Sequence, residues 1–246
     1  MSNPKPLPES RTNPIRLGVA LRALWRLSRD NDDTTHVFEI VDALRGDSDL
    51  RNVERMRESE IGRAILAERR SLLDVLADRE RLRALPDGSL GRVYLAFMER
   101  EGLTADGLAA AADEGYRQRT FDPDVRTFAD WARDSHDLWH VLTGYGRDEA
   151  GESANLAFTY GQTRSRGAGI LAVTAALIGM KTHPIGWPRY LYRAWRRGRR
   201  AAMLPVAPWE DLLPRPLALV RQSLGVEPPE KAHPEGIIAG NRGDDV

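Results

Sequence analysis

The stretch His136-Asp137-Leu138-Trp139-His140 organises the chain, and Glu152 follows it after eleven residues. At 3.6 residues per helical turn, the second histidine lies about 40° from the first and the aspartate about 100°, so the three side chains share one arc. Gly144-Tyr145-Gly146 predicts the end of this helix and a turn. Glu152 can therefore return on a second helix. Two imidazoles and two carboxylates converging from a helix pair suit a divalent metal.

The spacing leaves the fourth ligand open, because Asp148 and Glu149 stand close to Glu152. A lone His-x-x-x-His pattern is weak evidence, since many helices contain it by chance. In the alternative interpretation, both histidines are structural and hydrogen-bond to Asp134 and Asp137. A zinc protease would need glutamate where Asp137 stands. A His-Asp phosphohydrolase would need a second His-Asp pair, and the sequence has none.

A helix that carries both histidines is predicted to begin at Asp122 and Pro123, as N-cap and first helical residue, and to run to about Leu142. Its two sides differ in character. The apolar side holds Phe128, Trp131, Leu138, Trp139 and Leu142, and the polar side holds Arg126, Arg133, Asp134 and Asp137. The histidines fall at the border, which gives a metal site walls on one side and an open coordination position on the other.

Further helices are predicted on both sides of this segment. Apolar residues recur at helical spacing over 14–29, 37–46, 150–162, 167–180 and 209–224, and two charged helices are expected within 49–83. No segment has sustained strand alternation, a phosphate-binding glycine loop or a nucleophile elbow. We expect an all-α fold with one helical domain at 15–227, a flexible arm at 1–14 and a disordered tail at 228–246.

The composition excludes several classes of protein. The chain has 246 residues, no net charge and no cysteine, so disulfides, thiolate zinc sites and cysteine nucleophiles are excluded. Balanced charge gives no reason to expect nucleic acid as a partner. The longest apolar run, 168–180, is shorter than the roughly 18 residues that a membrane span requires. We expect a soluble or peripheral protein.

Two other stretches have alternative interpretations. The segment 167–180 is apolar and rich in glycine and alanine, which favours a buried helix over a groove for an apolar ligand. The segment 190–200 mixes tyrosine and tryptophan with arginine. It fits an anionic membrane surface or an acidic partner as well as it fits a solvated helix end.

The pattern His136-Asp137-x-x-His140-(x)11-Glu152 resembles the signature of the Coq-four family of ubiquinone (coenzyme Q) biosynthesis proteins. Other segments agree in the same order. They are the turn Leu85–Gly91, the pair Gly151-Glu152 that opens the second motif helix, and the ending Trp209–Leu213, Pro216-Leu217 and Leu224–Val226. The similarity covers most of residues 30–226. The basic run 190–200 is denser than the family pattern, and the lack of an evident mitochondrial presequence favours a bacterial member.

The resemblance implies an all-helical metalloenzyme in which His136, Asp137, His140 and Glu152 bind a divalent ion, expected to be zinc, between two central helices. The implied reaction is the oxidative removal of the carboxylate at ring carbon one of a polyprenylated hydroxybenzoate, so the enzyme would be a decarboxylase. We expect Arg133 to orient that carboxylate as a further catalytic residue.

Asn155, one turn beyond Glu152, is the residue expected to contact the substrate ring. The expected partners are the prenylated intermediate, other ubiquinone-synthesis proteins and a membrane surface, and a homodimer is compatible with the resemblance. The expected location is the cytoplasm, including the inner membrane surface. The alternative function is a non-catalytic scaffold that binds prenyl lipids. A metal-dependent hydrolase that shares the local motif is a third reading.

Overall fold

The structure is a computed structural model that describes residues 14–27, 29, 35–107 and 122–234. Every regular element in this part is a helix, and Ser89 and Pro216 form an isolated antiparallel bridge. The prediction of an all-α fold is confirmed. Among the described residues, no helix combines the length and the apolar character needed to cross a bilayer.

The helices follow one another along the chain with short connections. They are α1 (Leu17–Leu27), α2 (Thr35–Ala43), α3 (Ser48–Glu58), α4 (Glu60–Glu68), α5 (Leu72–Ala77), α6 (Arg79–Arg83), α7 (Leu90–Arg100), α9 (Pro123–Asp134), α10 (His136–Thr143), α11 (Glu149–Thr163), α12 (Arg166–Gly179), α13 (Gly186–Arg200), a 3₁₀ turn η2 (Leu204–Val206), α14 (Trp209–Leu212), α15 (Leu217–Ser223) and α16 (Pro229–Ala232).

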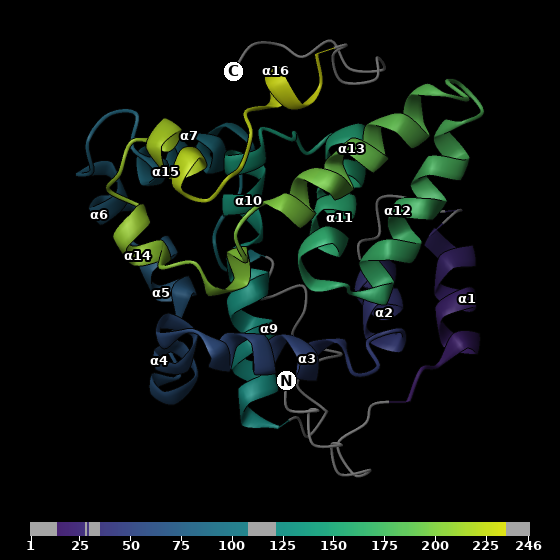
Figure 1. Cartoon of the computed structure of the whole chain (residues 1–246), viewed down its shortest axis with the longest axis horizontal. Helices are drawn as coiled ribbons and strands as arrows, with labels where there is room; N and C mark the ends of the chain where they lie inside the picture. Colours follow the sequence, from purple (N-terminus) through teal and green to yellow (C-terminus); the bar gives the residue numbers. More distant parts are fainter. Residues whose placement is uncertain (1–13, 28, 30–34, 108–121, 235–246) are drawn as a thin grey trace.

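Helices α9 and α10 lie end to end near the middle of the molecule (Figure 1). α10 packs against α7 on one side and α11 on the other, and α11 packs in turn on α12 and α13. α1 and α2 form a pair that contacts α12. Large buried side chains, among them Tyr94, Phe158 and Trp209, fill the main core around the central helices. The metal-site motif therefore lies on helices that are buried on several sides.

The single helix expected from Asp122 to Leu142 is wrong in one respect, because it is two helices. It begins as predicted, since Asp122 caps it by accepting a hydrogen bond from the backbone N–H of Asp124 at 2.9 Å. It is interrupted at the buried Ser135, whose hydroxyl donates to the carbonyl of Ala132 at 3.2 Å. Such a bond to the preceding turn bends helices. The break sets the direction of α10 independently of α9.

The disordered tail was expected to begin at residue 228, but the structure folds residues 228–234 onto the domain. α16 lies in this segment, and the His233 side chain behind it is buried. The Tyr145 hydroxyl lies 2.8 Å from Nε2 of His233, and Arg197 donates to the carbonyl of Glu227. These contacts join residues far apart in sequence. The arm at 1–13 and the tail at 235–246 lie outside the described residues and stay predictions.

The segment 167–180 is only half buried, so the expectation of a buried helix is wrong. Gly167 and Leu171 of α12 face the core, whereas Val173 is 59% exposed and Leu177 63% exposed. Its small residues lie where α12 meets its neighbours: a Cβ at Gly167 would lie 2.5 Å from Cα of Val41 on α2. The outer face of α12 is therefore an apolar surface.

Helices α11 and α13 cross at two glycines. A Cβ at Gly198 would lie 2.3 Å from the carbonyl oxygen of Phe158, and a Cβ at Gly161 would lie 2.6 Å from the carbonyl oxygen of Trp195. Only glycine allows the two backbones this approach. The crossing matters to the site because α11 carries Glu152 and Asn155.

Replacing Gly198 by alanine is expected to lower the free energy of unfolding by about 2–3 kcal/mol, because the added methyl group overpacks a backbone contact that cannot yield. Gly18 is the matched control, since it is helical and has no atom within 4 Å of an added Cβ. Gly18→Ala should stabilise by about 0.5 kcal/mol through helix propensity. Urea unfolding measures both changes, and equal effects of the two substitutions would contradict the close crossing.

Candidate metal centre

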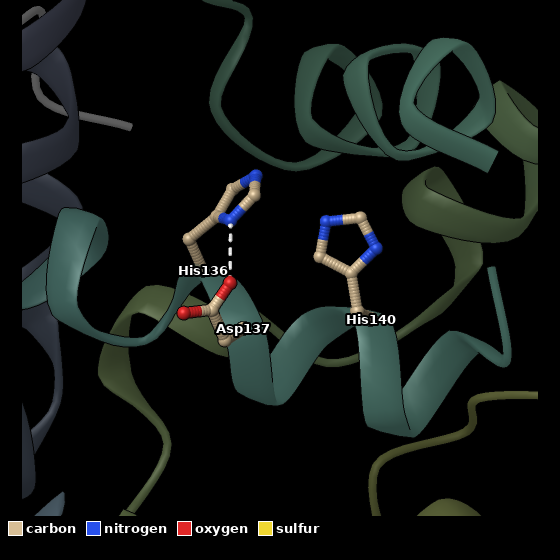
Figure 2. A group of neighbouring side chains, drawn as sticks. All are labelled: His136, Asp137 and His140. Carbon is tan, nitrogen blue, oxygen red and sulfur yellow. Dashed lines mark hydrogen bonds and ion pairs between the residues drawn. The ribbon is translucent and has the colours of Figure 1, made fainter. Parts of the chain in front are cut away.

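His136, Asp137 and His140 form a group that could hold a metal ion. Each offers one ligand atom, and these atoms all lie within 4.8 Å of one another. Figure 2 shows both imidazole rings projecting from the same side of α10, with Asp137 beside the first. The ring centroids are 4.7 Å apart and the rings are nearly perpendicular. The arc predicted from the helical period is therefore present.

His140 is the buried member of the group, with 1% of its surface exposed. Its Nδ1 lies 2.9 Å from the backbone carbonyl of Tyr145, in the turn that follows α10. A carbonyl oxygen can only accept, so Nδ1 carries the proton and donates it. The neutral ring then has its lone pair on Nε2, which is the state a metal ligand requires. The Phe97 ring stacks on the imidazole at 6.0 Å and holds it from the α7 side.

His136 and Asp137 form a pair at the edge of the group. Nδ1 of His136 lies 3.3 Å from Oδ1 of Asp137 and can donate to it, which again leaves a lone pair on Nε2. The side chain of His136 is 35% exposed, whereas that of Asp137 is 9% exposed. Placing Asp137 on the polar side of the helix was therefore misleading, because neighbouring helices cover that side as well.

Glu152 approaches the group from α11. Its Oε2 lies 3.5 Å from Nε2 of His140. The other two carboxylates left open by the sequence lie elsewhere: Asp148 caps α11 by accepting from the N–H of Gly151 at 2.9 Å, and Glu149 is exposed. Among the three carboxylates, Glu152 is the one beside an imidazole.

The buried charges of the group support one another. Burial alone would raise the pKa of Asp137, but the hydrogen bond with His136 and the positive charges nearby hold it below its usual range. Burial would likewise raise the pKa of Glu152, and the bond with His140 outweighs it and lowers that pKa. Burial opposes protonation of His140, yet Glu152 raises its pKa overall. Both carboxylates are thus ionised at neutral pH, as a cation would need.

Asn155 lies in the middle of the group. It is 1% exposed, and its Nδ2 lies 3.0 Å from Nε2 of His140 and 3.3 Å from Nε2 of His136. Its amide oxygen is buried and has no hydrogen-bond partner. The sequence suggested a contact to the substrate ring, but the structure directs this side chain at the two histidines.

Arg133, expected to orient a substrate carboxylate, is engaged on its own helix. Its guanidinium lies 2.8 Å from Asp130 and 2.9 Å from Asp134. Arg147 was not foreseen. It lies in the turn between α10 and α11, with Nε 3.8 Å from Glu152. The glycines mark this turn in the sequence, but nothing there distinguishes Arg147 from other surface arginines.

The last turn of α10 is held by residues from the C-terminal third of the chain. Arg197 donates to the carbonyl of Thr143 at 2.7 Å, and Arg221 donates to the carbonyls of Leu142 and Val141 at 2.8 and 3.1 Å. These carbonyls have no partner within the helix. The helix ends at Gly144, in the left-handed conformation at φ 72°. The helix that carries the histidines is therefore fixed by distant cations.

Tyr145 connects the site to the folded tail, since its carbonyl holds His140 and its hydroxyl meets His233. Burial, together with the charges of Arg197 and Arg193 on α13, lowers the pKa of His233 to about 4. The neutral ring is the form that the folded protein favours.

The stability of the protein is therefore expected to fall between pH 6.5 and 4. In that range the unfolded chain binds a proton at His233 that the folded chain does not, so stability increases with pH across the window. About 2 kcal/mol is expected, after discounting the 1.4 kcal/mol per pKa unit for residual solvent screening. Urea unfolding of wild type and His233→Phe at pH 7 and pH 4.5 measures it. The variant should lose less stability on acidification, and parallel losses would contradict this role.

The donor atoms of the site fit a divalent metal. Two imidazole Nε2 atoms with fixed tautomers and two ionised carboxylates match the nitrogen and oxygen ligands of zinc. The bond from Nδ1 of His140 to a backbone carbonyl is the outer contact that orients metal-binding histidines. The buried, unpartnered oxygen of Asn155 adds a further donor beside them.

Comparisons with known proteins agree with one another. The profile of the family described as coenzyme Q (ubiquinone) biosynthesis protein Coq4 matches residues 16–230. The chain is 30% identical over 176 residues to ubiquinone biosynthesis protein COQ4, mitochondrial, of Pyricularia oryzae, covering 72% of this chain and 56% of that protein. It is 29% identical over 180 residues to the Yarrowia lipolytica protein of the same description, covering 72% of this chain and 65% of that protein. The chain thus spans less than two thirds of the length of both relatives.

The fold is also found in a solved structure. A crystal structure of a candidate ubiquinone biosynthesis protein from Nostoc punctiforme superposes with a TM-score of 0.63 at 23% identity. The match covers 87% of this chain and 97% of that one. At this identity the comparison establishes the shared fold.

Proposed function

The chain belongs to the coenzyme Q (ubiquinone) biosynthesis protein Coq4 family, and on that premise we propose that it is a metal-dependent decarboxylase of ubiquinone biosynthesis. Its substrate would be a polyprenylated hydroxybenzoate, and its product would carry a hydroxyl group where the ring carboxylate was. The observation that carries the proposal is the convergence of two Nε2 lone pairs on one point, beside the carboxylates of Asp137 and Glu152.

His136, Asp137, His140 and Glu152 are the proposed ligands, and zinc is the proposed ion because it accepts this mixture of nitrogen and oxygen donors. When bound, the metal would supply positive charge that holds a substrate oxygen and stabilises negative charge as carbon dioxide leaves. The partly exposed side chains of His136 and Glu152 mark the open side of the site, whereas His140 lies against Phe97. Substrate would therefore approach past His136 and Glu152.

An arginine at that open side would meet the substrate carboxylate. Arg147 is exposed and lies next to Glu152, so it can reach an incoming anion. Arg133, the residue proposed from the sequence, would first have to leave Asp130 and Asp134. We therefore favour Arg147 for this role and keep Arg133 as the second candidate.

The chemistry balances with dioxygen as the oxidant. The bond between ring carbon one and the carboxylate breaks, carbon dioxide leaves, and one oxygen atom enters as the new hydroxyl. The second oxygen atom is reduced to water by an external two-electron donor. Zinc has no redox chemistry, so oxygen would react with the electron-rich ring itself. Asp137 and Glu152, both ionised, are the groups that could accept the phenolic proton.

The test follows the carboxylate carbon. Protein stripped of metal with a chelator and protein reloaded with Zn²⁺ are each given a prenylated hydroxybenzoate labelled at the carboxyl carbon, in air and under argon. Labelled carbon dioxide from the reloaded protein alone supports the proposal. Release that needs air makes the reaction oxidative. No release by protein that binds one zinc per chain would overturn the enzymatic function.

A non-catalytic scaffold that binds prenyl lipids is the second candidate, and the exposed apolar face of α12 favours it. Ile170, Val173, Leu177 and Ile178 lie on that face. In this function the protein would meet a membrane surface, a second copy of itself or other ubiquinone-synthesis proteins. Its location would be the membrane that holds the quinone. Lipid binding that survives removal of the metal, without any release of carbon dioxide, would favour the scaffold.

A further inference from the structure

Asn155 occupies the point on which the two histidines converge. It lies on α11 one turn beyond Glu152, on the same face, and its Nδ2 lies within 3.3 Å of both Nε2 atoms. No other described side chain contacts both rings through a polar atom. The side chain is almost completely buried, so solvent does not compete for these contacts.

The amide nitrogen and a metal ion need the same two lone pairs. Each Nε2 can accept one hydrogen bond or coordinate one ion. A zinc ion bound to both would lie about 2.0–2.1 Å from each nitrogen. The Nδ2 group stands about 3 Å from both, directly in front of the lone pairs. It must therefore move when an ion binds.

The other end of the same amide is suited to the ion. Oδ1 of Asn155 is buried and has no hydrogen-bond partner, which is costly for an acceptor in the interior. A carboxamide carries donors at one end and an acceptor at the other, and rotation about its last side-chain bond exchanges them. That rotation would bring a neutral oxygen donor next to the lone pairs that the ion uses.

We propose that Asn155 is a two-state ligand of the metal centre: its NH₂ group holds both Nε2 atoms when no ion is bound, and its Oδ1 coordinates the ion when one binds. The proposal rests on the metal site of the proposed function and adds a fifth protein ligand to it. Asn155 is then a metal-binding residue and does not contact the substrate ring.

Cobalt(II) binding tests this without any assay of activity, because the intensity of its visible bands reports coordination number and geometry. Asn155→Leu keeps the number of side-chain atoms and removes both ends of the amide. Its Co²⁺ affinity is expected to fall by about 10-fold or more. Its visible bands should intensify as one ligand is lost. Asn155→Asp keeps an oxygen donor and should retain the wild-type spectrum with equal or higher affinity.

Ser153→Ala is the matched control, because Ser153 is buried on the same helix and its hydroxyl donates to the carbonyl of Glu149. It should leave affinity and spectrum unchanged. Circular dichroism establishes that each variant is folded. A wild-type spectrum in folded Asn155→Leu overturns the proposal, whatever its affinity, since the amide is then not a ligand. Wild-type protein that binds no Co²⁺ overturns the proposed function as well, so the two failures are distinguishable.

Discussion

Replacing His136 by alanine is expected to reduce metal affinity by at least about 100-fold, since loss of outer contacts alone costs 10–100-fold at metal sites. Release of carbon dioxide should fall with it. His136 is the better choice for this test than His140, because its side chain is 35% exposed and its removal leaves no buried cavity. The free energy of unfolding of the metal-free protein should change by less than about 1 kcal/mol.

Metal per chain is measured by elemental analysis after dialysis, beside the carbon dioxide assay. His183→Ala is the control, because His183 is exposed in the segment between α12 and α13 and bonds only to its neighbour Thr182 among the described contacts. It should keep metal and turnover. Full metal occupancy in folded His136→Ala would make the histidines structural, which was the alternative that the sequence left open.

Replacing Arg197 by alanine is expected to lower the free energy of unfolding by about 3–4 kcal/mol. Arg197 is 4% exposed and donates to the carbonyls of Thr143 and Glu227, while its guanidinium lies 5.1 Å from the centroid of the Tyr145 ring. Its loss leaves two carbonyls without a partner in the interior, at about 1–3 kcal/mol each, and opens a cavity.

Arg196→Ala is the control for this prediction. Arg196 precedes Arg197 on α13, is exposed and lies 5.9 Å from the centroid of the Tyr192 ring. The change should cost less than about 0.5 kcal/mol. Denaturant unfolding of the metal-free proteins compares the two. Similar small losses in both variants would mean that the end of α10 does not depend on Arg197.

Local patterns were sufficient to predict much of the site. The 3.6-residue period placed His136, Asp137 and His140 on one arc, and the glycines after α10 indicated that Glu152 returns on the next helix. Asp122 and Pro123 marked the start of α9 correctly. Each of these inferences depends on residues a few positions apart, where helix geometry leaves little choice.

Contacts between distant segments could not be predicted in this way. The tail was expected to be disordered from residue 228 because it is polar and rich in proline and glycine, but His233 finds Tyr145 and the chain folds back. Asn155 was assigned to the substrate because the direction of α11 relative to α10 is set by its crossing with α13. The run 190–200 was treated as one basic surface, yet Arg197 within it points into the core.

The dependence of α10 on Arg197, Arg221 and the segment up to His233 has a consequence for the order in which the site is made during synthesis. α10 has 8 residues, too few to persist as an isolated helix, and the residues that hold its last carbonyls are translated more than fifty positions later. A nascent chain that has just released the two histidines from the ribosome therefore lacks the parts that orient them. Metal loading should be a property of the finished polypeptide.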